Sequence, residues 1–106
     1  MSDDVEIWVV AGQYLARSGR EGELAAVLAQ YTVLTRGVGG CRNVDLVASA
    51  SVPGKFLVIE KWDDPDAQRA HLDDPVMVGM ATAATPLLAT APDLDLYEAI
   101  SAHDLE

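Results

Sequence analysis

The sequence contains little cysteine, little positive charge and no long hydrophobic run. Among its 106 residues there is one cysteine, Cys41, so no disulfide bond can form within the chain. Seven basic residues stand against seventeen acidic ones, which gives a formal net charge of −10. Nucleic acids and anionic membranes would be repelled, because both are bound mainly through clustered lysines and arginines. We therefore expect neither as a partner.

The N-terminal residues do not have the features of an export signal. They include Asp3, Asp4 and Glu6 and no basic residue, whereas a secretory signal begins with a positively charged region. No apolar run approaches the ~20 residues that cross a bilayer. Together with the single cysteine, these features lead us to expect a protein of the reducing cytoplasm.

Half of the residues are hydrophobic, and this amount is sufficient for a core. A chain of this length is the usual size of one domain. We expect a single domain over residues 1–106, with its core within 5–101 and a polar tail at 102–106.

Alternating and helical hydrophobic patterns predict the order β-α-β-β-α-β. The predicted strands are residues 5–14, 41–50, 55–63 and 93–101, and the turn at 51–54 joins the middle two. The first helix is expected to begin at a capping box, Ser18 to Glu21, and to end near Arg36 before a run of glycines. Its apolar face is predicted to contain Leu24, Val27, Leu28, Tyr31 and Leu34.

Two Asp-Pro pairs divide the second helical region. Asp64-Pro65 is typical of a capped helix start, and Ala67, Ala70 and His71 follow it at helical spacing. Asp74-Pro75 repeats the signal, so we expect a break there and a second helix over residues 76–89, which Pro86 would kink or end.

This order predicts an α+β, ferredoxin-like fold, in which a four-stranded antiparallel sheet has its helices on one face. Leu57 and Ile59 would then be apolar residues on the face without helices. An exposed apolar face usually marks an interface, so we expect a homodimer formed through the sheet faces.

Glu60 and His71 are the candidate proton-transfer residues. Glu60 shares a strand face with Phe56 and Trp62, and a carboxylate in apolar surroundings needs a specific partner. His71 is predicted to point toward the same interior, and imidazole transfers protons near neutral pH. A structural role for each is the alternative. The positions of Cys41, His71 and His103 lack the spacing of a zinc site, and we expect no metal.

Several segments in order resemble the antibiotic biosynthesis monooxygenase family. They are residues 19–24, Thr35-Arg36, Gly40-Cys41, the strand from Phe56 to Glu60-Lys61-Trp62, and Ala70-His71-Leu72. The resemblance implies dimers of ferredoxin-like subunits whose sheets face each other in an α+β barrel, with a cavity between sheet and helices. It also implies a mixed set of activities, because some members oxidise phenols or quinols with O2 and no cofactor, some degrade haem and some isomerise phosphorylated sugars.

Departures from the family patterns reduce the number of family activities that this sequence could support. Trp62 matches the strand tryptophan of the polyketide-type oxygenases, but Val58 stands where they place an asparagine. The first strand has no asparagine and residues 76–81 contain no histidine, so the residues that haem degraders use are missing. Haem degradation is therefore disfavoured.

The resulting hypothesis is a cofactor-independent monooxygenase that oxidises an aromatic phenol, anthrone or quinol with O2. His71 or Glu60 would be the base, and Trp62 and Phe56 would stack on the substrate. Tyr14 or Tyr97 would bind a substrate oxygen if either faces the cavity. The alternatives are a non-redox isomerase or ligand-binding dimer of the same fold, and a dimer without a ligand.

Overall fold

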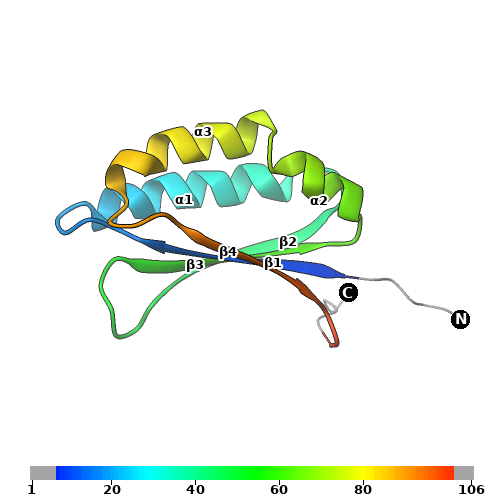
Figure 1. Cartoon of the computed structure of the whole chain (residues 1–106), viewed down its shortest axis with the longest axis horizontal. Coiled ribbons are helices and arrows are strands. Elements are labelled where there is room, and N and C mark those ends of the chain that lie inside the picture. Colours follow the sequence, from blue (N-terminus) through cyan, green and yellow to red (C-terminus); the bar gives the residue numbers. More distant parts are fainter. Residues whose placement is uncertain (1–6, 102–106) are drawn as a thin grey trace, which may run out of the picture.

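The structure is a computed structural model that describes residues 7–101. The elements follow in the order β1 (Trp8–Leu15), α1 (Glu21–Arg36), β2 (Cys41–Ala48), β3 (Lys55–Trp62), α2 (Pro65–His71), α3 (Pro75–Ala84), the short 3-10 helix η1 (Thr85–Leu87) and β4 (Asp93–Glu98). The helices lie on one side of an antiparallel sheet (Figure 1). The predicted ferredoxin-like α+β fold is confirmed, whereas Val5 and His103 lie outside the described residues.

The strands are arranged in the order β2-β3-β1-β4, so β3 and β1 are central and β2 and β4 form the edges. Trp8 pairs with Trp62 and Val10 with Glu60 across the two central strands. Directly paired residues point to the same face of a sheet. The predicted face of Phe56, Glu60 and Trp62 is buried beneath the helices, as the alternation in β3 indicated.

Helix α1 packs on the sheet through a stripe that differs from the predicted one at its end. Leu24, Leu28 and Tyr31 are buried as expected, but Leu34 is 49% exposed and Thr35 is fully buried. The spacing of 24, 28, 31 and 35 keeps one straight face of a 3.6-residue helix, and Leu34 lies to the side of it. Geometry here places a threonine in the interior and a leucine at the surface.

The predicted capping box at the start of α1 is not formed. Arg20 is the N-cap residue and makes no side-chain capping bond. Gly19 has a φ of 85° and turns the chain, so Ser18 lies outside the first helical turn. The Glu21 carboxylate instead accepts a hydrogen bond from the backbone N–H of Gly19.

The predicted break in the second helical region is confirmed. The Asp64 side chain caps α2 and the Asp74 side chain caps α3. Ala70 is exposed, and the inward face of α2 consists of Gln68 and His71. Helix α3 ends at Ala84 rather than near residue 89, because Pro86 has no backbone N–H to continue the helical hydrogen bonds, and the chain goes on as the short 3-10 helix η1.

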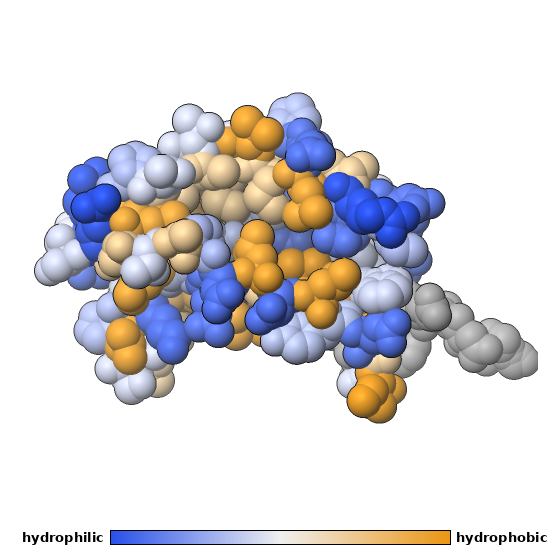
Figure 2. Space-filling view, in the orientation of Figure 1, coloured by the Kyte–Doolittle hydropathy of each residue, from blue (hydrophilic) through white to orange (hydrophobic). Residues whose placement is uncertain are grey.

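The face of the sheet without helices is partly apolar. Leu57 and Ile59 of β3 are half-buried there, beside Ala11 of β1. All six residues of the edge strand β4 are exposed. On the side viewed in Figure 2, apolar side chains interrupt the charged ones below the helices. Within residues 7–101, no helix has the length and hydrophobicity needed to cross a membrane.

Candidate functional site

Strand β3 places a carboxylate and an indole side by side under the helices. Glu60 is 5% exposed and Trp62 is not exposed at all. The two side chains are two residues apart on a strand, so they point to the same face. The indole Nε1–H of Trp62 donates a hydrogen bond of 3.0 Å to Oε1 of Glu60. This bond fixes one oxygen of the carboxylate.

Helix α1 brings a phenol to the other oxygen of Glu60. The hydroxyl of Tyr31 lies 2.5 Å from Oε2 of Glu60 and donates to it. The same hydroxyl oxygen lies 2.9 Å from Nε2 of His71. Tyr31 therefore bridges the carboxylate and the imidazole, and the expected specific partner of Glu60 is found.

Helix α2 presents His71 at its C-terminal end, where the side chain is 2% exposed. The hydroxyl oxygen of Thr35 lies 3.3 Å from Nε2, and the Trp62 ring centroid lies 5.2 Å from the imidazole centroid. On the other side of the ring, Nδ1 lies 2.6 Å from Oδ2 of Asp74. His71 thus links the residues of β3 and α1 to the start of α3.

Asp74 has two roles, one for each carboxylate oxygen. Its Oδ1 accepts a hydrogen bond from the backbone N–H of Met77 and caps α3, while Oδ2 faces His71. Burial alone would raise the pKa of Asp74, but the hydrogen bonds from Met77 and His71 outweigh burial and hold the pKa below its usual range. Asp74 is therefore ionised at neutral pH and accepts a hydrogen bond from Nδ1–H of His71.

The groups around Glu60 are held in their protonated forms. Burial and the charge of Glu60 raise the pKa of Tyr14 to about 12. The same two causes, with the hydrogen bond to Glu60, raise the pKa of Tyr31 well above its usual range. Burial first and the Glu60 charge second raise the pKa of the Cys41 thiol to about 11, which makes this thiol a poor nucleophile at neutral pH.

The structure brings together Glu60, Trp62 and His71 from among the residues that the sequence nominated. Phe56 and Tyr14 lie on the same helix-facing side of the sheet but belong to the hydrophobic core cluster. Tyr97 pairs with Val9 and lies on the other face, where its side chain is exposed. Of the two tyrosines proposed to face a cavity under the helices, Tyr14 is on the correct side and Tyr97 is not.

Three members of the network were not nominated as site residues. The sequence predicts Tyr31 on the apolar face of the first helix and Asp74 as a helix cap. It does not predict that Thr35 is buried. A tyrosine within an apolar helix stripe was the available signal, because a buried phenol needs a hydrogen-bond partner. The spacing of three residues between His71 and Asp74 was a second, weaker signal.

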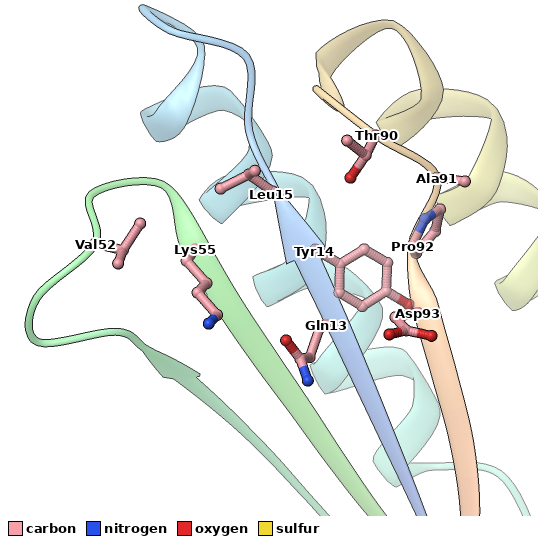
Figure 3. Close-up of a pocket in the computed structure, with 9 residues that line it drawn as sticks. All are labelled: Gln13, Tyr14, Leu15, Val52, Lys55, Thr90, Ala91, Pro92 and Asp93. Atoms are coloured by element: carbon pink, nitrogen blue, oxygen red, sulfur yellow. The ribbon is translucent and has the colours of Figure 1, made fainter.

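The largest described cavity lies at the opposite end of the sheet. It has a volume of about 440 Å³ and is lined by Gln13, Tyr14, Leu15, Val52, Lys55, Thr90, Ala91, Pro92 and Asp93 (Figure 3). A smaller space of about 200 Å³ between α1 and α3 is lined by Tyr31 of the network, and another of about 120 Å³ lies beside Trp8. None of the five described cavities is lined by Glu60, Trp62 or His71.

Metal-binding side chains do not cluster in the part of the chain that the structure describes. Within residues 7–101, no group of three or more histidine, cysteine, aspartate or glutamate side chains lies close enough together to hold a metal ion.

Comparison with known proteins gives one family. Residues 7–82 match the family model described as antibiotic biosynthesis monooxygenase. A protein from Deinococcus radiodurans, provisionally named as an antibiotic biosynthesis monooxygenase, has 27% identity and a TM-score of 0.82 over 93% of this chain and 98% of its own. No curated protein sequence matches.

Two further solved structures share the fold at lower identity. A Mycobacterium tuberculosis protein has 21% identity and a TM-score of 0.84, covering 92% of this chain and 99% of its own. A protein of unknown function from Nitrosomonas europaea has 22% identity and a TM-score of 0.85, covering 96% and 97%. At these identities the likeness concerns the fold alone.

Proposed function

Because this chain belongs to the antibiotic biosynthesis monooxygenase family, we propose that it is a cofactor-independent monooxygenase that oxidises an aromatic phenol, anthrone or quinol with O2. Membership of the family supports a monooxygenase-like function in general. The observation that carries the more specific proposal is the buried chain of hydrogen bonds from Trp62 through Glu60, Tyr31 and His71 to Asp74.

Fold stability alone does not explain a buried network of ionisable groups. Buried ionisable groups carry a large desolvation cost, and replacing them with packed apolar side chains is often neutral or stabilising. Ionisable groups held in dry surroundings next to specific partners are characteristic of catalytic sites. Glu60 and His71 together supply a base and a proton acceptor on the helix-facing side of the sheet, where the resemblance to the family implies a cavity.

The proposed chemistry needs only a proton acceptor and an apolar environment. Glu60 removes a proton from the substrate, and the resulting anion passes one electron to O2. The two radicals combine into a peroxide anion at carbon, and Glu60 returns its proton to give the hydroperoxide. Loss of water leaves a carbonyl group, so one oxygen atom of O2 enters the product and the other leaves with the two hydrogens of the substrate.

A substrate can approach Glu60 from the edge of the sheet that no helix covers. Glu60, Val10 and Leu96 form one row across β3, β1 and β4 on the helix-facing side, and Leu96 is half-exposed. Gly12 and Leu94 form the next row, where the missing side chain of Gly12 makes room for Leu94. This strip offers a flat ring an apolar surface that leads to the carboxylate.

Trp8 supplies a hydrogen-bond donor at the same strip. Its indole Nε1–H is buried and has no partner among the described residues. An unsatisfied buried donor costs ~1–3 kcal/mol, and a substrate oxygen would satisfy it. Trp8 lies on the helix-facing side two residues before Val10, so its N–H can hold the oxygen of a substrate whose proton Glu60 removes.

O2 consumption by the purified protein tests this function. With anthrone or a substituted hydroquinone, we expect uptake of one O2 for each carbonyl formed and no requirement for added flavin or metal. Glu60→Gln should abolish most of this uptake, whereas Asp45→Asn, which changes an exposed strand carboxylate on the other face, should not. The proposal is wrong if phenols, anthrones and quinols all fail, or if both variants behave alike.

The largest described cavity, at the end of the sheet away from Glu60 (the far cavity), favours a second candidate function, which is binding or isomerisation of a polar small molecule. Lys55, Gln13 and Asp93 border this space of about 440 Å³, and they provide an ammonium, an amide and a carboxylate (Figure 3). Arg36 is not available for this purpose, because its guanidinium donates to the backbone carbonyl of Val44. Calorimetry with a panel of sugar phosphates, on wild type and Lys55→Met, tests this alternative.

The proposed assembly is a homodimer formed through the uncovered face of the sheet. Leu57, Ile59 and Ala11 are only half-buried there. A stable interface buries ~800 Å² per partner, and apolar strand faces commonly provide it. Sedimentation at micromolar concentration should give a dimer, and Ile59→Glu should give a monomer. A stable wild-type monomer would contradict this assembly.

A further inference from the structure

We infer that Tyr31 is a proton relay between Glu60 and His71, and that Asp74 passes the proton on to solvent. The inference rests on the proposed function for the origin of the proton, but the relay itself follows from the contacts. Tyr31, His71 and Asp74 connect the carboxylate in the interior to the surface through three successive short contacts. Neither family membership nor the sequence pattern assigns this role to Tyr31 or Asp74.

Glu60, Tyr31 and His71 form a hydrogen-bonded bridge, and a count of hydrogens shows that its two hydrogen bonds contain two protons. The hydroxyl oxygen of Tyr31 is in hydrogen-bonding contact with both Glu60 and His71, yet a hydroxyl carries only one hydrogen. A second hydrogen must lie on Oε2 of Glu60 or on Nε2 of His71. Without it, two lone pairs would face each other across one of the contacts in a buried site.

The two hydrogens can be arranged in two ways on the same heavy atoms. In the first, Nε2–H of His71 donates to Tyr31, and Tyr31 donates to an ionised Glu60. In the second, a protonated Glu60 donates to Tyr31, and Tyr31 donates to Nε2 of a neutral His71. The arrangements interconvert when each hydrogen moves along its own hydrogen bond, and no side chain has to turn.

Both arrangements leave the bridge electrically neutral as a whole, either as an ion pair or as two neutral groups. This lowers the cost of burying it, because an unpaired charge would be disfavoured where Glu60 and His71 are almost completely enclosed. A low-dielectric environment also strengthens a chain of hydrogen bonds. Proton movement between carboxylate and imidazole therefore needs little rearrangement of the surroundings.

Asp74 provides the exit because it is both ionised and accessible. Its side chain is 24% exposed, whereas that of His71 is 2% exposed. From the second arrangement, the hydrogen of Glu60 moves through Tyr31 to Nε2, and this leaves Glu60 ionised and able to accept the substrate proton. His71 then carries a hydrogen on each ring nitrogen and releases the one on Nδ1 to Asp74 and water. One proton enters at Glu60 and one leaves at Asp74, so the charge of the bridge is restored. When Glu60 later gives its proton to the peroxide, one proton returns from water through Asp74 to His71.

The first test measures the relay without any substrate. The nitrogen-15 resonance of Nε2 reports whether that atom carries a hydrogen, and Glu60→Gln is introduced into wild type and into Tyr31→Phe. We expect Glu60→Gln to move this resonance when Tyr31 is present and to leave it in place when Phe replaces Tyr31. Equal displacement in both backgrounds would mean that Glu60 acts on His71 only through space, and the relay would be wrong. Tyr97→Phe, which removes an exposed hydroxyl on the other face, is the matched control.

The second test separates the exit role of Asp74 from its capping role. Asn is as good a helix cap as Asp, so Asp74→Asn keeps the bond to Met77 and removes the charge that faces His71. Asp64→Asn makes the same change at the cap of α2, away from the network. We expect Asp74→Asn alone to slow turnover ~10-fold or more and to change its solvent isotope effect. Equal behaviour of the two variants would overturn the exit role.

The outcomes for the relay and for the proposed function can be told apart. If no phenol or anthrone is oxidised but the Nε2 resonance responds as expected, the relay stands and the monooxygenase function falls. If O2 is consumed and Tyr31→Phe leaves both turnover and the Nε2 response unchanged, the function stands and the relay falls.

Discussion

The two ends of the sheet differ in what they contain. Where β3 meets α1 and α2, buried polar side chains satisfy one another and no described cavity reaches the carboxylate. At the other end, Lys55 and Asp93 border a cavity of about 440 Å³. Reactivity requires groups that are fixed and dry, whereas binding requires space. Variants at the network end should therefore lose turnover, and variants at the cavity end should lose ligand binding.

Replacing His71 with alanine should have the largest effect, and among the kinetic quantities it should lower turnover rather than raise KM. A residue that handles the transferred proton typically contributes ~10²–10⁴-fold to the rate, while KM depends mainly on contacts that the substrate makes elsewhere. Steady-state O2 uptake, measured on samples whose thermal midpoints are known, gives both quantities. If His71→Ala retains full turnover, the network end has no part in the reaction.

Replacing Trp62 with alanine should affect stability as well as activity. The side chain is completely buried, and removal of such a ring costs ~3–5 kcal/mol of unfolding free energy. Trp62→Phe keeps a flat ring but removes the N–H that holds Oε1 of Glu60. We expect this second variant to stay folded and to turn over more slowly. Urea unfolding and kinetics on the same preparations compare them, and equal rates for Trp62→Phe and wild type would remove the role given to this bond.

Tyr14 lies between the two ends, since it lines the far cavity and feels the charge of Glu60. Its pKa rises from 10.0 to about 12 on folding, so its contribution to stability is fully present below pH 10 and is lost as the pH rises toward 12. Cys41, raised from 9.0 to about 11, adds to the same loss. Unfolding free energies measured above pH 9 should fall, and Tyr14→Phe should make the fall shallower. Tyr97→Phe serves as the exposed control, and equal slopes for the two variants would contradict the assignment.

Lys55→Met should have the smallest effect on the molecule itself. The side chain is exposed, and surface substitutions usually change stability by less than ~0.5 kcal/mol. We expect unchanged O2 uptake with an aromatic substrate and weaker binding of any anionic ligand that calorimetry finds. A loss of oxidation comparable with that of His71→Ala would mean that the two ends act as one site.

The order of elements and the position of Glu60 were predictable because local patterns determine them. Strict alternation in β3 assigns Glu60 and Trp62 to one face, and Asp-Pro pairs define the helix starts at 64 and 74. The same rules place His71 near the interior. These features depend on neighbouring residues along the chain, so the sequence alone is informative about them.

The partners of these residues were not predictable because they depend on packing between distant elements. Tyr31 meets Glu60 across 29 positions, and only the rotation of α1 on the sheet decides that Thr35 rather than Leu34 points inward. Tyr97 lies on the other face because the pairing of β4 with β1 fixes its register. Asp74 was correctly seen as a cap, but its second oxygen had no local signal.

The exposed edge strand β4 has a consequence for handling the protein. Its outer backbone groups are open to pairing with another chain, and its leucines would favour aggregation through this edge. Asp93 and Asp95 alternate with the leucines and Glu98 ends the strand, so repulsion between copies opposes such pairing. The acidic residues of β4 thus oppose association of copies through the unprotected edge of the sheet. Neutralising Asp93, Asp95 and Glu98 should therefore increase precipitation of the protein.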